Sequence, residues 1–270
     1  MVLKFLLFIH VLQTYEKVQK LVEQLRVLSE GEIDDENVPA ILDVLRQWIK
    51  LCMDSDHRSE NQRILFNLSA HSAVLNLCQN PFHDIGVEEE TNINTYSFHF
   101  LMHLCKNNSK IQTELFEHFD FFASYLERVP RVAELLTELV RNSARNLMLI
   151  SERQIQNLVN FVASGHRQAR FLDCLLACCT LNGSPVRRNQ VMVMRLMLEQ
   201  GKQTLVLFND PESAAERNVM IRAGDYRDWH HIINYHIALV DLLTTCCQGR
   251  IYESEISKSI GFFCSVFFIF

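Results

Sequence analysis

Four segments of the chain share one pattern, and this repeat constrains the fold more than any other feature of the sequence. Each segment has two large apolar residues, two spacers, two residues that are mostly small or apolar, and then a polar end. The segments are Phe100–Asn108, Leu135–Ser143, Leu175–Gly183 and Leu242–Arg250, which begin 35, 40 and 67 residues apart. Armadillo and HEAT repeats have a period of about 40 to 47 residues. The pattern predicts an all-α, armadillo/HEAT-like helical solenoid whose units bury their Leu and Cys faces against one another, with a simple helical bundle as the alternative.

The composition favours helices over sheets. Only 8 Gly and 5 Pro occur among 270 residues, too few for a fold that needs many tight turns. Apolar residues spaced by three and four predict a first helix with one apolar stripe, formed by Val11, Tyr15, Val18, Val22 and Leu25. Further helices are expected from Pro39 to Cys52 and near residues 60–79, 92–106, 109–127, 131–149, 152–163, 167–181, 187–200, 212–222 and 229–247. Thr204–Phe208 is the one candidate strand, and it is too short to imply a sheet.

The charged residues and the cysteines limit the class of protein. There are 26 basic and 32 acidic residues, a net charge of −6, and no long basic run, so the footprint of a nucleic-acid or anionic-membrane binder is absent. The cysteines lie inside apolar helical runs, as in the pairs Cys178, Cys179 and Cys246, Cys247. They are therefore predicted to be reduced core thiols of a protein in a reducing compartment.

Both ends of the sequence are apolar. The segment Met1–Ile9 has no small-residue cleavage pattern after it, so a signal peptide is the less favoured interpretation. The segment Ile260–Phe270 is shorter than the roughly 20 residues that span a bilayer. We therefore expect no transmembrane helix, and divide the chain into an apolar extension at 1–10, the helical repeats at 11–256 and an apolar tail at 257–270.

Residues that could carry chemistry are few. His99 and His103 stand four apart, a spacing at which two imidazoles on one helix face can bind zinc. Position 100 is Phe, however, where a zincin helix needs its general-base Glu, and a third ligand is missing at a recognised spacing. His230, His231 and His236 are also weak candidates, because residues 231 and 236 do not share a clean helix face. Since C-x-x-C pairs, nucleophile elbows and phosphate loops are also absent, we predict no catalytic residue, metal or cofactor, and keep a metalloenzyme built on the first pair as a minor alternative.

One basic loop is a candidate contact for a partner. Arg187 and Arg188 follow the turn Gly183–Pro185 and begin a helix at the end of a repeat. Two adjacent guanidinium groups can clamp a carboxylate or a phosphate. The alternative is that both side chains are solvated or pair with an acidic neighbour.

Several segments resemble the inositol trisphosphate receptors. Gln190–Asp210 is similar to a family passage in which a helix ends and a short hydrophobic run leads into Asn-Asp, and Tyr235–Glu253 is similar to the family's Tyr-His-Ile-x-Leu-Val-x-Leu-Leu stretch. Weaker matches in the same order are Gln62–Leu65 with Ala70–Leu75, and Val11–Gln13 with Val18–Val22. The similarity covers about Val11 to Ile256. It corresponds to the second homology domain shared by ryanodine and inositol trisphosphate receptors.

This resemblance implies a cytosolic, armadillo-like module of a tetrameric, inositol trisphosphate-gated calcium-release channel in the endoplasmic reticulum membrane. Such a module would transmit conformational change between ligand binding and the pore, contact other receptor domains and neighbouring subunits, and make no direct contact with inositol phosphates. A ryanodine-receptor-type module is one alternative. Another is a free-standing armadillo adaptor that binds peptides, although only Trp48 and Trp229 could contribute to a Trp ladder.

Overall fold

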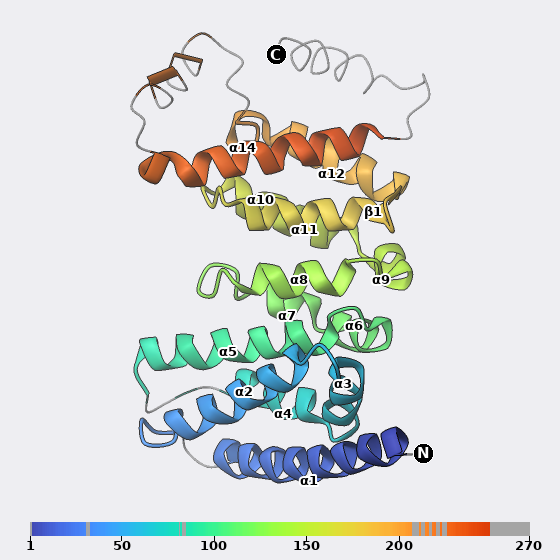
Figure 1. Ribbon diagram of the computed structural model, residues 1–270. Coiled ribbons are helices and arrows are strands. Elements are labelled where there is room, and N and C mark those ends of the chain that lie inside the picture. The colour runs from blue at the N-terminus through green and yellow to red at the C-terminus, as the bar shows by residue number, and fades with distance from the viewer. Residues whose placement is uncertain are drawn as a thin grey trace. The chain divides into compact units, whose positions relative to one another are not determined.

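The computed structural model describes residues 2–30, 33–80, 82, 85–206, 211, 214, 215, 218, 219, 222 and 226–248. Helices dominate these residues, and the regular strands among them form one short antiparallel pair (Figure 1). The chain divides into two compact units, Met1–Leu139 and Val140–Phe270. Each unit is described separately below.

The first unit consists of helices that pack on one another. Its elements are α1 (Val2–Glu30), α2 (Val38–Met53), α3 (Arg58–Asn67), α4 (Ala70–Gln79), α5 (Val87–Cys105), α6 (Ser109–Phe116), α7 (Phe119–Ala123) and α8 (Val132–Val140), of which α8 crosses the division by one residue. Helix α2 begins with a proline in its first turn, as the sequence predicts, and packs along α5. Between these two helices the ring centres of Trp48 and Phe100 lie 5.0 Å apart, and both side chains are wholly buried. Burying one side chain of this size stabilises a fold by about 1.5 to 3 kcal/mol.

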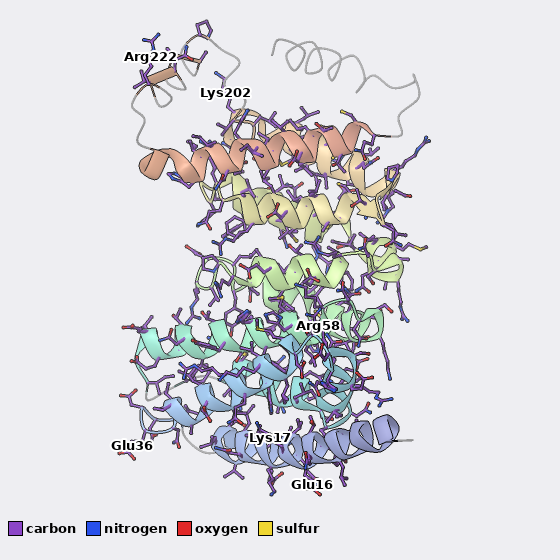
Figure 2. The ribbon with its side chains drawn as sticks, viewed as in Figure 1. Glu16, Lys17, Glu36, Arg58, Lys202 and Arg222 are labelled. Atoms are coloured by element: carbon purple, nitrogen blue, oxygen red, sulfur yellow. The ribbon has the colours of Figure 1, made fainter. Side chains whose placement is uncertain are left out.

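The apolar stripe predicted for the first helix is largely confirmed, with one error. Val18, Val22 and Leu25 are buried, but Tyr15 is 42% exposed and Thr14 is buried instead. Thr14 lies four residues before Val18 and therefore shares its face, whereas Tyr15 is turned further round the helix. Charged residues of α1 such as Glu16 and Lys17, both labelled in Figure 2, are exposed.

The second unit is built around the pair α11 and α14. Its elements are α9 (Ala144–Leu149), α10 (Glu152–Ala163), α11 (Ala169–Cys179), β1 (Thr180–Leu181), β2 (Ser184–Pro185), α12 (Arg187–Gln200), η1 (Gly201–Gln203) and α14 (Tyr226–Cys247). Helix α12 packs against α10, α11 and α14. Helix α10 begins with a capping box, in which Ser151 Oγ accepts a hydrogen bond from Gln154 N at 3.2 Å.

The four repeat segments lie in equivalent places on α5, α8, α11 and α14. The first and fifth residues of every segment are wholly buried; these pairs are Phe100 and Leu104, Leu135 and Leu139, Leu175 and Cys179, and Leu242 and Cys246. Residues four apart share one face of a helix, so each repeat helix presents the same apolar face to its neighbours. The described residues therefore have the all-α, helical-solenoid type of fold that the sequence predicts.

In three of the segments the eighth residue lies two or three residues beyond the end of the repeat helix. Asn107, Asn142 and Asn182 occupy this position and have φ angles of 58°, 55° and 49°. Asparagine is one of the few residues other than glycine that enters this left-handed region at low cost. The fourth segment has Gly249 at the same position, outside the described residues. Asparagine in the left-handed conformation thus follows the end of three of the four repeat helices.

Buried carboxamides connect the repeat helices to neighbouring helices. In every segment the fourth carbonyl accepts a hydrogen bond from such a side chain: Gln62 Nε2 donates to His103 O (3.0 Å), Gln112 Nε2 to Glu138 O (2.7 Å), Asn189 Nδ2 to Cys178 O (2.9 Å), and Gln190 Nε2 to Thr245 O (2.8 Å). All four donor residues are buried. We call these bonds the carboxamide clasps. They satisfy carbonyls near helix ends that the helix itself leaves without donors.

Three segments predicted as single helices are each divided in the structure. Residues 60–79 form α3 and α4, residues 109–127 form α6 and α7, and residues 131–149 form α8 and α9. The first division falls at Ser69, which has a φ of 59°, and the last at Asn142. A left-handed residue interrupts the right-handed helix, so the chain changes direction there.

Two further boundaries differ from the sequence prediction. The helix expected near residues 92–106 begins earlier, at Val87, and the glutamates of its first turn interact favourably with the positive end of the helix dipole. The candidate strand at Thr204–Phe208 is wrong over its described residues, which follow η1 without strand pairing. The strands lie instead on either side of Asn182–Gly183, and Asn-Gly is the dipeptide typical of a two-residue hairpin.

Candidate interaction surface

The predicted contact loop lies where α9 meets α12 in the second unit. The hairpin of β1 and β2 reverses the chain after α11, and Val186 N donates to Cys179 O at 2.9 Å to close it. Arg187 and Arg188 then form the first turn of α12, and both are exposed. The hairpin and the helix start therefore hold the two arginines in a defined position.

Arg188 binds the end of α9. Its Nη1 donates to Met148 O at 3.1 Å and its Nη2 to Ile150 O at 3.3 Å. The neighbouring Asn189 donates to Leu147 O at 2.9 Å from a buried position. A guanidinium group at a helix C-terminus satisfies carbonyls without donors and complements the helix dipole. Arg188 therefore helps to hold α9 against α12. The sequence did not reveal this role, because the carbonyls that Arg188 binds lie about 40 residues earlier in the chain.

Exposed apolar side chains surround this contact. Met148 is 77% exposed, Leu149 56% and Val191 42%. Val191 lies three residues after Arg188 and four after Arg187, so all three share one face of α12. We define the α9–α12 surface as Arg145, Met148, Leu149, Arg187, Arg188 and Val191.

The charge around this surface is opposite in sign to that of the whole chain. Residues 141–153 and 187–195 contain arginines at 141, 145, 153, 187, 188 and 195, and one acidic residue, Glu152. Glu152 forms an ion pair with Arg195, which also pairs with Glu199 at 3.0 Å. This arginine-rich, partly apolar surface therefore differs in charge from the chain as a whole, which has a net charge of −6.

The histidine pair comes together on α5 as its spacing predicts. His99 Nε2 and His103 Nε2 lie 3.0 Å apart, within hydrogen-bonding distance, and both rings are half-buried. Burial, and then nearby Arg131, lower the pKa of His99; burial, His99, Lys106 and Arg58 lower the pKa of His103 to about 4. Both rings are therefore neutral at pH 7. In the described part of the chain, no group of three or more His, Cys, Asp or Glu residues is placed to hold a metal ion.

In the second histidine group, the described residues His231 and His236 belong to no set of three or more potential metal ligands. His236 Nδ1 lies 2.7 Å from Val206 O, and His231 is exposed. The side chain of His230 lies outside the described residues, as does that of Trp229.

The cysteines have the environment of core thiols. Among the described cysteines none is in a disulfide, Cys247 is half-buried, and Cys52, Cys78, Cys105, Cys174, Cys178, Cys179 and Cys246 are buried. Burial raises the pKa of Cys52 and Cys78 to about 12. A thiol with so high a pKa has almost no thiolate at neutral pH and is a poor nucleophile.

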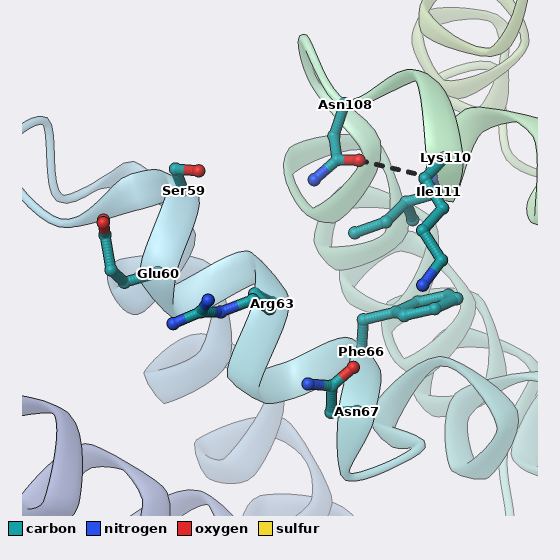
Figure 3. Close-up of a pocket in the computed structure, with 8 residues that line it drawn as sticks. All are labelled: Ser59, Glu60, Arg63, Phe66, Asn67, Asn108, Lys110 and Ile111. Atoms are coloured by element: carbon teal, nitrogen blue, oxygen red, sulfur yellow. Dashed lines mark hydrogen bonds between the residues drawn. The ribbon is translucent and has the colours of Figure 1, made fainter.

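Each unit has a cavity that opens on its surface. The first, of about 380 Å³, lies between α3 and the start of α6 (Figure 3), where Lys110 Nζ sits 5.5 Å from the centre of the Phe66 ring. Its Ser59 and Glu60 are adjacent on one helix and so do not face each other as a nucleophile and a base would. The second, of about 370 Å³, is lined by Arg141, Asn142, Asp173, Leu176, Ala177 and Thr180.

Taken by itself, the described part of the chain is an α-helical repeat module with one positive, partly apolar surface. A family model of the RIH domain, the homology domain of ryanodine and inositol trisphosphate receptors, matches residues 43–209. The chain belongs to this family. It is 23% identical over 231 residues to the inositol 1,4,5-trisphosphate receptor itr-1 of Caenorhabditis elegans, a match that covers 81% of this chain and 8% of that receptor. Along the described residues, no helix has the length and the apolar character needed to cross a membrane.

Proposed function

We propose that the chain is a regulatory module of an inositol trisphosphate-gated calcium-release channel, and that it transmits conformational change between ligand binding and the pore without catalysis. The family match supports a receptor module. The observation that carries the proposal is the set of carboxamide clasps, which tie each repeat helix to a neighbouring helix at the same position.

The clasps favour motion of helices as connected bodies. In the second unit, the adjacent residues Asn189 and Gln190 of α12 donate to the carbonyls of Cys178 on α11 and Thr245 on α14. Both donors are buried, where an unmade hydrogen bond costs about 1 to 3 kcal/mol. A displacement of α12 is therefore transmitted to both neighbours before the bonds break. Coupling of this kind needs rigid elements in contact with one another, which these bonds supply.

The charges oppose a direct role in binding inositol phosphates. The net charge is −6, and Arg188 already donates to two backbone carbonyls. Several phosphates would need several unoccupied cations on one site. We therefore propose that Arg187 and Arg188 contact protein, namely other receptor domains or neighbouring subunits of a tetramer on the cytosolic side of the endoplasmic reticulum membrane.

The alternatives have less support. The similarity to an inositol trisphosphate receptor favours that type over a ryanodine-type channel. A peptide-binding armadillo adaptor would present its amide side chains in an open groove. Here Gln62, Gln112, Asn189 and Gln190 are buried and bound to backbone carbonyls of the same chain.

The proposal is tested by placing variants of this segment in a complete receptor. Leu243 on α14 is buried, whereas Ile237 on the same helix is 53% exposed. Leu243→Ala weakens the packing of a repeat helix by about 2 to 5 kcal/mol, and Ile237→Ala serves as the matched control. We expect Leu243→Ala to alter ligand-evoked calcium release while the affinity for labelled inositol trisphosphate stays the same. If the isolated chain itself bound labelled inositol trisphosphate saturably, the proposed division of roles would be wrong.

A further inference from the structure

We propose that the α9–α12 surface binds an acidic amphipathic helix of a protein partner. The inference rests on the proposed function only in taking the chain as a module that contacts other proteins; it does not depend on the transmission of conformational change. Three observations carry it: the exposed apolar side chains, their fixed backbone and the surrounding arginines.

The apolar part of the surface is unusually open. Met148 and Leu149 are adjacent at the end of α9, and both are more than half exposed, while Val191 on α12 is 42% exposed. Apolar side chains grouped on a surface and rimmed by charged groups are typical of protein contact sites. The flexible, polarisable side chain of Met148 adapts to the shape of a partner.

The backbone under these side chains is fixed. Leu147 and Asn146, which precede Met148 on α9, are buried. The last carbonyls of the helix are held by Arg188 and Asn189 through three hydrogen bonds of 2.9 to 3.3 Å. The exposed residues are therefore presented on a preformed surface, and a partner that binds there loses little of its binding energy to ordering of this chain.

The arginines select a negatively charged partner with helical spacing. Arg187 and Val191 lie about one turn apart on the exposed face of α12, a rise of about 6 Å. An acidic residue and an apolar residue one turn apart on a partner helix match this arrangement. Guanidinium groups bind carboxylates through two parallel hydrogen bonds, which gives orientation as well as attraction.

A membrane is the less favoured occupant. Polybasic membrane-binding segments use clusters of about four to eight lysines or arginines that are available to lipid headgroups. Here Arg188 donates to backbone carbonyls and Arg195 pairs with Glu152 and Glu199. The α9–α12 surface has three arginines, Arg145, Arg187 and Arg188, which is fewer than such a cluster.

The test uses the whole 270-residue chain and a labelled 18-residue helical peptide with leucines on one face and glutamates beside them. We expect saturable binding that weakens as salt rises, and none by a second peptide with lysine at every glutamate position. The variants Met148→Asp and Arg187→Glu are expected to weaken binding about tenfold or more. Their matched controls in the first unit are Val87→Asp, at a residue 77% exposed, and Arg63→Glu, which are expected to leave binding unchanged.

Each other outcome overturns the inference. Equal binding of the lysine peptide would show that charge does not select the partner. Binding that survives both Met148→Asp and Arg187→Glu would place the site elsewhere. Preferential binding to vesicles containing phosphatidylserine would make the occupant a membrane, and self-association lost on Met148→Asp would make it a second copy of the chain. None of these results bears on calcium release by the complete receptor, so this inference and the proposed function fail separately.

Discussion

The sulfur atoms of Cys179 on α11 and Cys246 on α14 lie 3.7 Å apart, and both residues occupy the fifth position of their repeat segments. Two helices that are 67 residues apart in sequence thus meet at equivalent positions. Their shared hydrogen bond, together with burial, raises the pKa of Cys179 well above its usual range. Positions that are equivalent in the sequence repeat are therefore in contact in the folded structure.

The buried thiols are expected to be protected in the native protein. A thiol reagent at pH 8 should modify the half-buried Cys247 first and the seven buried cysteines slowly, because burial keeps them as neutral thiols. In denaturant all of these cysteines should react quickly. Mass spectrometry of the labelled protein against time measures both rates, and similar rates in the two states would contradict the burial of these side chains.

Gln112→Leu is expected to destabilise the first unit. The variant removes the donor of a 2.7 Å hydrogen bond and leaves the buried Glu138 carbonyl without that partner. The expected loss in the free energy of unfolding is about 1 to 3 kcal/mol, measured by urea denaturation. Gln47→Leu is the control, since Gln47 bonds Asp43 on the exposed face of α2. Equal losses in the free energy of unfolding for the two substitutions would mean that the Gln112 clasp does not stabilise the fold.

Replacing Asn107 by glycine is expected to leave the stability nearly unchanged, and replacing it by valine is expected to lower the stability. Its φ angle of 58° lies in the left-handed region, and its side chain is exposed, so the effect of substitution comes from the backbone. Asn107→Val should lower the free energy of unfolding by about 1 to 2 kcal/mol, whereas Asn107→Gly should leave it nearly unchanged. Thermal unfolding of the two variants compares them directly. A valine variant as stable as the glycine variant would contradict the left-handed end of α5.

The His99–His103 pair predicts how stability changes at acidic pH. The folded-state pKa of His103 is lowered from 6.5 to about 4, mainly by burial. Between these values the unfolded chain binds a proton that the folded chain does not, so stability falls as pH drops from 6.5 towards 4. An NMR titration should show the His103 ring neutral at pH 5.5, and His103→Gln should reduce the loss of stability. Protonation with a midpoint near 6.5 would contradict this environment.

The sequence predicts the repeats well and the ends of the short helices poorly. The buried faces of α5, α8, α11 and α14 follow from their apolar spacing alone, because burial of that face is local to each helix. The divisions at Ser69 and Asn142 do not, since a serine or an asparagine is compatible with a helix until the packing of neighbours fixes a positive φ. Asn-Gly at 182–183 is the signal for the hairpin, but this segment was predicted only as a turn between two helices.

Only the adjacent arginines of the α9–α12 surface could be predicted from the sequence. Arg187 and Arg188 stand out in the sequence because they follow a turn and begin a helix. Met148 and Leu149 do not stand out, since they continue an apolar run that suggests a core helix. Their exposure results from the division of that helix at Asn142, which leaves α9 only six residues long and turns its end outward. The contact between Arg188 and α9 depends on tertiary structure that no local pattern encodes.

The most direct test of the account is a pair of dose–response measurements on a complete receptor that carries Gln190→Leu in this segment. The substitution removes the bond between α12 and the Thr245 carbonyl of α14, and Gln156→Leu on α10 is the control, because Gln156 bonds only Asn160 at the exposed surface. The account predicts that Gln190→Leu changes the concentration of inositol trisphosphate that gives half-maximal calcium release, while the dissociation constant of labelled inositol trisphosphate stays as in the control. Unchanged calcium release by a well-folded Gln190→Leu receptor would contradict it and make the module a passive spacer.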